Sequence, residues 1–137
     1  MSKLQIKHLT IGEGMPKIIV PLVGSTTEGI LQEAALVKEM TPDVVEWRVD
    51  TYEQVDDIHA VKEMLGRLRT VFQKELILFT FRSHKEGGNK EISDDYYIEL
   101  NQAAIRTNNI DLVDIELFNE ERVVKAILAA AKENGVL

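Results

Sequence analysis

The stretch "VVEWRVD", residues 44–50, has the β-branched and aromatic density of a buried strand but carries a charge at every second position. Successive strand side chains point to opposite faces, so Glu46, Arg48 and Asp50 are predicted to share one face of the strand. The apolar residues of the stretch are predicted to share the other face. The pattern therefore predicts a strand with one apolar and one charged face, and the fold must accommodate those charges.

Composition limits the class of protein and its partners. The chain has 137 residues, of which 45% are hydrophobic and 28% charged, as is typical of one soluble globular domain. A net charge of −7 argues against a nucleic-acid partner, and no basic run or membrane-length apolar segment indicates a membrane. The absence of cysteine excludes disulfides, thiolate metal sites and a cysteine nucleophile. The N-terminus lacks the apolar core of a signal peptide, so we expect a cytoplasmic location.

Short β-rich runs alternate four times with segments of helical periodicity. The predicted strand and helix pairs are 17–24 with 25–40, 43–50 with 55–73, 75–83 with 93–107, and 110–118 with 120–135. Such alternation predicts βαβ units, and hence a parallel sheet with right-handed crossovers. Residues 1–16 are predicted to form an N-terminal β-hairpin. Because no linker divides the sequence, residues 1–137 are predicted to form a single unit.

Three helix boundaries carry local signals. Ser25 and Glu28 have the spacing of a capping box at the start of the first helix, and Ser93 is expected to start the third. The sequence Asn134-Gly135 is a stop signal for the fourth helix. Val136 and the residue after it are expected to begin a fifth strand, so we expect this chain to be part of something larger.

Charges recur on two further predicted strands, always toward the C-terminal end. In a doubly wound sheet, helices cover both faces, so its strands should be almost continuously apolar. In a (β/α)₈ TIM barrel, helices cover only the outer face, and the inner face opens into the active site at the C-terminal ends of the strands. The pattern therefore favours a barrel, of which four βα units would form half. The charged residues of this face are Glu46, Arg48, Asp50, Arg82, Asp114 and Glu116.

Burial of an unpaired charge is costly, so these side chains must pair with one another or with a ligand. Ion pairs that hold the strands in register, or an exposed sheet face, would also explain the pattern. The recurrence of charges at the same end of three consecutive strands favours a ligand pocket. No metal site is predicted, because His8, His59 and His84 have no suitable mutual spacing.

The stretches "IGEGMPKIIVPLVG", "VVEWRVD", "LFTFRSHKEGG" and "VDIELF" occur in this order, and with them the chain resembles the type I 3-dehydroquinate dehydratases. These are Schiff-base lyases of the shikimate pathway, which leads to the aromatic amino acids. The likeness covers essentially the whole chain but only about the N-terminal half of a family member. It implies a (β/α)₈ barrel, here about four βα units, with the hairpin of residues 1–16 closing the barrel bottom. It also implies dehydration of 3-dehydroquinate to 3-dehydroshikimate without a cofactor.

The resemblance also implies roles for particular residues. Glu46, Arg48 and Arg82 would line the pocket and hold the hydroxyls of 3-dehydroquinate. Glu86 resembles the loop glutamate that supports the catalytic histidine. Pro21 stands where some relatives carry a serine near the ligand, so no ligand contact is assigned to it. A supporting role deeper in the barrel is implied for Asp50, Asp114 and Glu116.

The family's catalytic histidine and Schiff-base lysine lie on its fifth and sixth strands, beyond Leu137. Neither His84 nor Lys85 matches them. A polypeptide of these 137 residues alone is therefore expected to supply substrate-binding residues but to lack activity. Its partners would be 3-dehydroquinate and either the C-terminal half-barrel or a second copy of the chain. The alternative is a non-catalytic half-barrel that self-associates or binds a small polyol or anion.

Overall fold

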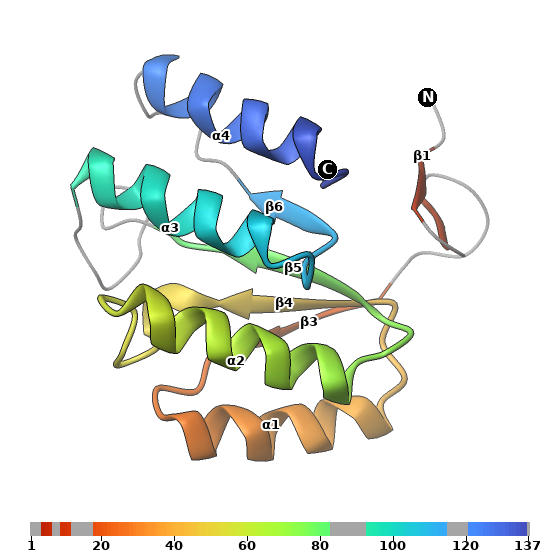
Figure 1. Cartoon of the computed structure of the whole chain (residues 1–137). Helices are drawn as coiled ribbons and strands as arrows, with labels where there is room; N and C mark the ends of the chain where they lie inside the picture. Colours follow the sequence, from red (N-terminus) through yellow and green to blue (C-terminus); the bar gives the residue numbers. More distant parts are fainter. Residues whose placement is uncertain (1–3, 7–8, 12–17, 83–92, 115–120, 137) are drawn as a thin grey trace.

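The computed structural model describes residues 4–6, 9–11, 18–82, 93–114 and 121–136 (Figure 1). All four predicted strand and helix pairs are present, although the first three strands of these pairs are shorter than predicted. The elements are β1 (Leu4–Ile6), β2 (Leu9–Ile11), β3 (Ile19–Leu22), α1 (Thr27–Glu39), β4 (Val44–Arg48), the 3₁₀ turn η1 (Val49–Thr51), α2 (Ile58–Val71), β5 (Leu76–Thr80), α3 (Asp94–Arg106), β6 (Leu112–Asp114) and α4 (Glu121–Glu133).

Strands β3 to β6 form one parallel sheet in sequential order, and the helices pack against one face of it (Figure 1). A doubly wound sheet would have helices on both faces, so this arrangement is that of a barrel wall. The predicted α/β architecture of about four βα units is thereby confirmed. Strands β1 and β2 pair antiparallel, with Leu4 opposite Ile11, and form the predicted N-terminal hairpin.

The strand register sorts side chains into two faces. Trp47 on β4 is aligned with Leu22 on β3 and Phe79 on β5, and all three are fully buried in the cluster beneath the helices. On the opposite face, Arg48 is aligned with Thr80. The predicted division of strand β4 into an apolar and a charged face is correct for Val45 and Trp47 on one side and Glu46 and Arg48 on the other, but wrong for Val44, which lies on the face of the charges.

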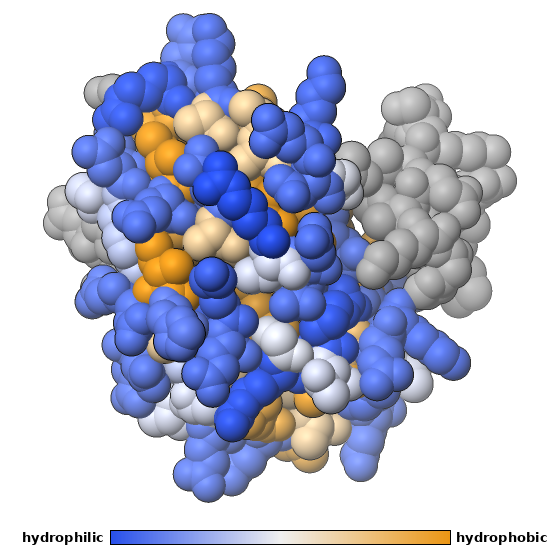
Figure 2. Space-filling view, viewed as in Figure 1, coloured by the Kyte–Doolittle hydropathy of each residue, from blue (hydrophilic) through white to orange (hydrophobic). Residues whose placement is uncertain are grey.

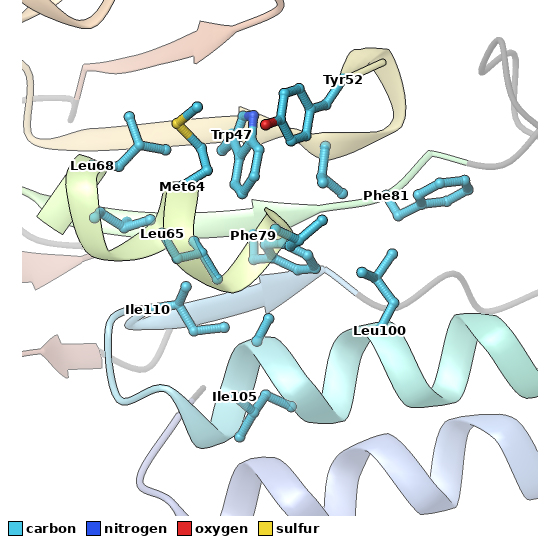
Figure 3. Packing of buried hydrophobic residues seen from close by; sticks show 14 of the residues in the cluster. Trp47, Tyr52, Met64, Leu65, Leu68, Phe79, Phe81, Leu100, Ile105 and Ile110 are labelled. Atoms are coloured by element: carbon cyan, nitrogen blue, oxygen red, sulfur yellow. The ribbon is translucent and has the colours of Figure 1, made fainter. Parts of the chain in front are cut away.

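The main core lies between the sheet and the helices (Figure 3). The ring of Trp47 packs against those of Tyr52 and Phe79, with centroids 5.7 Å and 5.8 Å apart. Met64 and Leu65 of α2 reach the same cluster, because the apolar residues of that helix recur on one side of it. This core fixes the positions of the strand ends that carry the charged residues.

The end of α4 confirms the predicted stop signal. Gly135 has a φ of +69°, and the N–H of Val136 donates to the carbonyl of Ala131 at 2.9 Å, as in a Schellman motif. Val136 is buried. Leu137 lies outside the described residues, so a fifth strand stays a prediction.

Hydrophilic residues cover most of the side that is seen in Figure 2, and hydrophobic residues surface only in smaller areas between them. Among the described residues, no helix combines the length and the apolar character needed to span a membrane.

Candidate functional site at the carboxyl ends of the strands

The site begins with Glu46 on β4 and Thr80 on β5. The Thr80 side chain is almost fully buried, and its hydroxyl donates to Oε2 of Glu46 at 2.9 Å. This bond orients the partly buried carboxylate, which has a second oxygen able to accept a hydrogen bond from a ligand. The sequence predicted no role in the site for Thr80; the available signal was its alternation with Phe79 and Phe81, which are both buried.

The position of Asp50 differs from the prediction. Strand β4 ends at Arg48, so Asp50 lies in turn η1 and not on the strand face. Its carboxylate nevertheless accepts from Nε of Arg48 at 3.0 Å and from Nη2 of Arg48 at 2.8 Å. The Asp50 side chain is fully buried, whereas that of Arg48 remains 19% exposed. Asp50 therefore belongs to the predicted site, but it contacts Arg48 from the turn and not from the strand.

The electrostatic surroundings of Arg48 keep it charged. Hydrogen bonds to Asp50 raise the pKa of its guanidinium; burial opposes this rise and is outweighed. The charges of Asp50, Glu46 and Asp114 contribute further to the increase. A guanidinium has five N–H donors, and Asp50 accepts from two of them. The others are available to bind an anion or a hydroxyl group.

Arg82 lies just beyond β5, next to this pair. Its backbone N–H donates to Oδ1 of Asp50 at 3.1 Å, so Asp50 links the ends of β4 and β5. The Arg82 residue is partly buried. The structure thus brings Glu46, Arg48 and Arg82 to the same end of two adjacent strands, as their spacing in the sequence predicted.

Asp114 lies on β6, the strand on the other side of β5 from Glu46 and Arg48. It ends β6, is aligned with Thr80, and is exposed. Two other predicted site residues, Glu86 and Glu116, lie outside the described residues.

A small apolar cluster underlies these polar groups on the same sheet face. It is nearer the N-terminal ends of the strands and contains buried Val44 and Leu76, with Leu78 and Leu112 packed against them. Within the described ranges there is no group of three or more metal-ligating side chains. An apolar base below oriented cationic and anionic groups can bind a small polar molecule that carries hydroxyl or carboxylate groups.

The chain is similar in sequence to a known family and to several of its members. Residues 18–137 match the family described as type I 3-dehydroquinase. The chain is 51% identical over 136 residues to the 3-dehydroquinate dehydratase of Bacillus subtilis, covering 99% of this chain and 53% of that protein. It is 48% identical to a Listeria monocytogenes protein of the same name, with 99% and 54% covered.

Solved structures agree with the sequence relatives. The type I 3-dehydroquinate dehydratase of Clostridium difficile, solved with covalently modified comenic acid, matches with a TM-score of 0.95 and 44% identity over 98% of this chain and 53% of its own. The Enterococcus faecalis 3-dehydroquinate dehydratase matches with a TM-score of 0.92 and 37% identity, with 97% and 55% covered. The chain therefore spans about half the length of these relatives.

Proposed function

Because the chain belongs to the type I 3-dehydroquinase family, we propose that it is the substrate-binding part of a 3-dehydroquinate dehydratase. The proposed reaction converts 3-dehydroquinate into 3-dehydroshikimate and water. A lysine amine condenses with the substrate ketone, and the resulting iminium accepts the electron pair left when the neighbouring proton is removed. A histidine acts as the general base and then as the acid for the departing hydroxyl, which leaves as water. Hydrolysis of the product iminium then consumes the water that was released on condensation and frees the lysine. This lysine and histidine belong to the part of the family fold that residues 1–137 do not span.

The convergence of Glu46, Arg48 and Arg82 at one end of β4 and β5 carries the proposal. The substrate offers hydroxyl and carboxylate groups, for which a guanidinium is a donor and the Glu46 carboxylate an acceptor. Oriented contacts of this kind hold the ketone in position for attack, so binding energy lowers the barrier of the chemical step.

Other residues complete the proposal. Glu86 supports the catalytic histidine, and Asp114 and Glu116 contribute negative charge to the pocket. The hairpin β1–β2 closes the bottom of the barrel, and the remaining half-barrel is the partner that completes the pocket. A cytoplasmic location is consistent with the absence of cysteine.

The test is a chimera in which residues 1–137 replace the matching half of the Bacillus subtilis relative. Dehydration is followed by the ultraviolet absorbance of the conjugated product. We expect turnover by the chimera and a loss of roughly 100-fold in kcat/KM for Arg82→Ala, because a hydrogen bond to a charged group is removed. Arg67→Ala on the outer helix α2, where the side chain is exposed, is the matched control and should have no effect. A folded chimera that Arg82→Ala leaves fully active would contradict the proposal.

A further inference from the structure

We infer that Asp50 is a positioning residue that orients the guanidinium of Arg48 and holds the backbone of Arg82 beside it, an inference that rests on the proposed function. Its carboxylate receives three hydrogen bonds from two neighbouring strand ends. Oδ1 accepts from Nε of Arg48 at 3.0 Å and from the backbone N–H of Arg82 at 3.1 Å, and Oδ2 accepts from Nη2 of Arg48 at 2.8 Å. The Asp50 side chain has no exposed surface, so solvent does not compete for these bonds.

The two-point contact with Arg48 determines the plane of the guanidinium. A single ionic contact would allow the group to rotate, whereas two parallel N–H···O bonds fix its orientation. The N–H groups that Asp50 does not use therefore have a defined direction before any ligand binds. Such preorganisation avoids the entropic cost of ordering a long side chain at the moment of binding.

Asp50 also keeps Arg48 away from its other anionic neighbours. The charges of Glu46 and Asp114 act on Arg48 as well, and both residues lie on the same sheet face. If the guanidinium turned toward Glu46, the two groups would satisfy each other and neither would be available to the substrate. The Asp50 pair thus leaves Glu46 free to accept a substrate hydroxyl.

The position of Asp50 is itself held by the turn that contains it. The Thr51 hydroxyl donates to the carbonyl of Arg48 at 2.8 Å and lies 3.3 Å from the carbonyl of Gly24. The N–H of Tyr52 donates to the carbonyl of Val49 at 3.0 Å and closes η1. These bonds explain why the chain leaves the strand after Arg48 and returns a carboxylate toward it.

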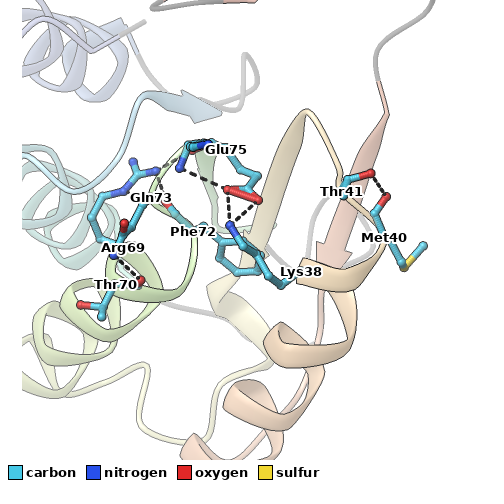
Figure 4. Close-up of polar contacts among 9 residues, drawn as sticks. Lys38, Met40, Thr41, Arg69, Thr70, Phe72, Gln73 and Glu75 are labelled. Carbon is cyan, nitrogen blue, oxygen red and sulfur yellow. Dashed lines mark hydrogen bonds and ion pairs between the residues drawn. The ribbon is translucent and has the colours of Figure 1, made fainter.

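The structure contains a matched ion pair outside the site (Figure 4). Lys38 at the end of α1 donates to both carboxylate oxygens of Glu75, at 3.0 Å and 2.9 Å. Glu75 is buried like Asp50, but it precedes β5 and so lies at the opposite end of the strand. Removal of its charge should affect stability without altering substrate binding.

The experiment compares Asp50→Asn, Arg48→Met and their double variant in the chimera, with Glu75→Gln as the control. Asparagine keeps an oxygen for the N–H of Arg82 but loses the two-point ion pair. We expect Asp50→Asn to lower kcat/KM about 10-fold, chiefly through a higher KM, because a small displacement of a binding group is sufficient. The double variant should be no less active than Arg48→Met, since Asp50 acts through Arg48. Glu75→Gln should lower Tm and leave KM unchanged.

The outcomes separate the inference from the proposed function. If Arg48→Met lowers kcat/KM but Asp50→Asn does not, Asp50 is not a positioning residue and the proposed function stands. If a folded Arg48→Met variant has full activity, the proposed function itself fails. Should Asp50→Asn not fold, Thr51→Val tests the same point: the inference requires a higher KM at unchanged folded content, and an unchanged KM overturns it.

Discussion

At the scale of single residues, the hydroxyl of Thr80 gives the most direct prediction. It donates to Oε2 of Glu46 from an almost fully buried position. In the chimera, Thr80→Val keeps the side-chain shape but removes the donor, and should raise KM for 3-dehydroquinate roughly 5-fold, the equivalent of one ordinary hydrogen bond. Steady-state kinetics provide the measurement. The control is Thr70→Val, because the Thr70 hydroxyl donates to the carbonyl of Gly66 within α2, away from the site. Equal KM values for the two variants would refute the role of Thr80.

Gly24, which follows β3, is a second residue whose effect can be predicted. A Cβ added there would lie 3.0 Å from the backbone nitrogen and 3.1 Å from Cγ1 of Ile30, a fully buried residue. We expect Gly24→Ala to lower the free energy of unfolding by about 1–2 kcal/mol through overpacking. Gly66→Ala in α2 is the matched control, because its Cβ would meet nothing within 4 Å, and it should stabilise by about 0.5–1 kcal/mol. Urea denaturation of the chimera measures both; stabilisation by Gly24→Ala would be inconsistent with the close contact.

At the scale of elements, the Lys38–Glu75 pair links the end of α1 to the start of β5. Burial raises the pKa of Glu75, but it is outweighed by the hydrogen bond from Lys38, the charge of Lys38 and hydrogen bonds from the backbone N–H groups of Glu75 and Lys74, so the pKa lies below its ordinary value of 4.5. A lowered folded-state pKa contributes stability that is present above the unfolded-state pKa and lost as pH falls through the folded-state value. We therefore predict that Glu75→Gln lowers the free energy of unfolding by about 1–2 kcal/mol at pH 7.

The pH dependence of stability tests the predicted contribution of the Lys38–Glu75 pair. The difference in unfolding free energy between the unsubstituted protein and Glu75→Gln should begin to shrink as pH falls below about 4.5, where the carboxyl group becomes protonated in the unfolded chain, and should be lost as pH falls through the lower folded-state pKa. Chemical denaturation at a series of pH values measures it. A difference that stays constant down to the lowest pH at which the protein folds would show that the charge of Glu75 contributes nothing.

The N-caps of two helices show where local sequence signals predict a helix start correctly and where they do not. Ser93 caps α3 as predicted, and its hydroxyl accepts from the N–H of Tyr96 at 3.1 Å. The predicted capping box of Ser25 is wrong, because Thr26 caps α1 and accepts from the N–H of Gly29 at 2.9 Å. The carbonyl of Ser25 instead accepts from the N–H of Glu53 at 2.8 Å. A contact with a distant loop thus decided between two adjacent residues with similar capping ability.

At the scale of the whole molecule, a polypeptide of residues 1–137 alone is predicted to show no dehydratase activity. The resemblance to the family implies that its Schiff-base lysine has no counterpart among these residues, and covalent catalysis requires that amine. The chimera, which contains the matching half of the Bacillus subtilis relative, is the positive control. The measurement is product absorbance at saturating 3-dehydroquinate after purification to a single species. Turnover by the purified polypeptide at a rate comparable to the chimera would contradict the prediction.

The sequence by itself determined the alternation of strands and helices and the buried face of β4 that carries Trp47. It also determined that the charged residues lie at the C-terminal ends of the strands. These features follow from residue periodicity and from which side chains can be buried, and both are properties of short segments. Glu46, Arg48 and Arg82 could therefore be predicted as neighbours once the strands were known to be parallel.

Only the tertiary structure decided which of these charges pair and how. Asp50 lies in a turn whose bonds reach Gly24, and its carboxylate accepts from the backbone of Arg82, 32 positions along the chain. Thr80 became part of the site through a bond to Glu46, 34 positions away. Such contacts depend on strand register and on the exact path of the chain after each strand. Register is set by packing between distant segments, which no local pattern in the sequence specifies.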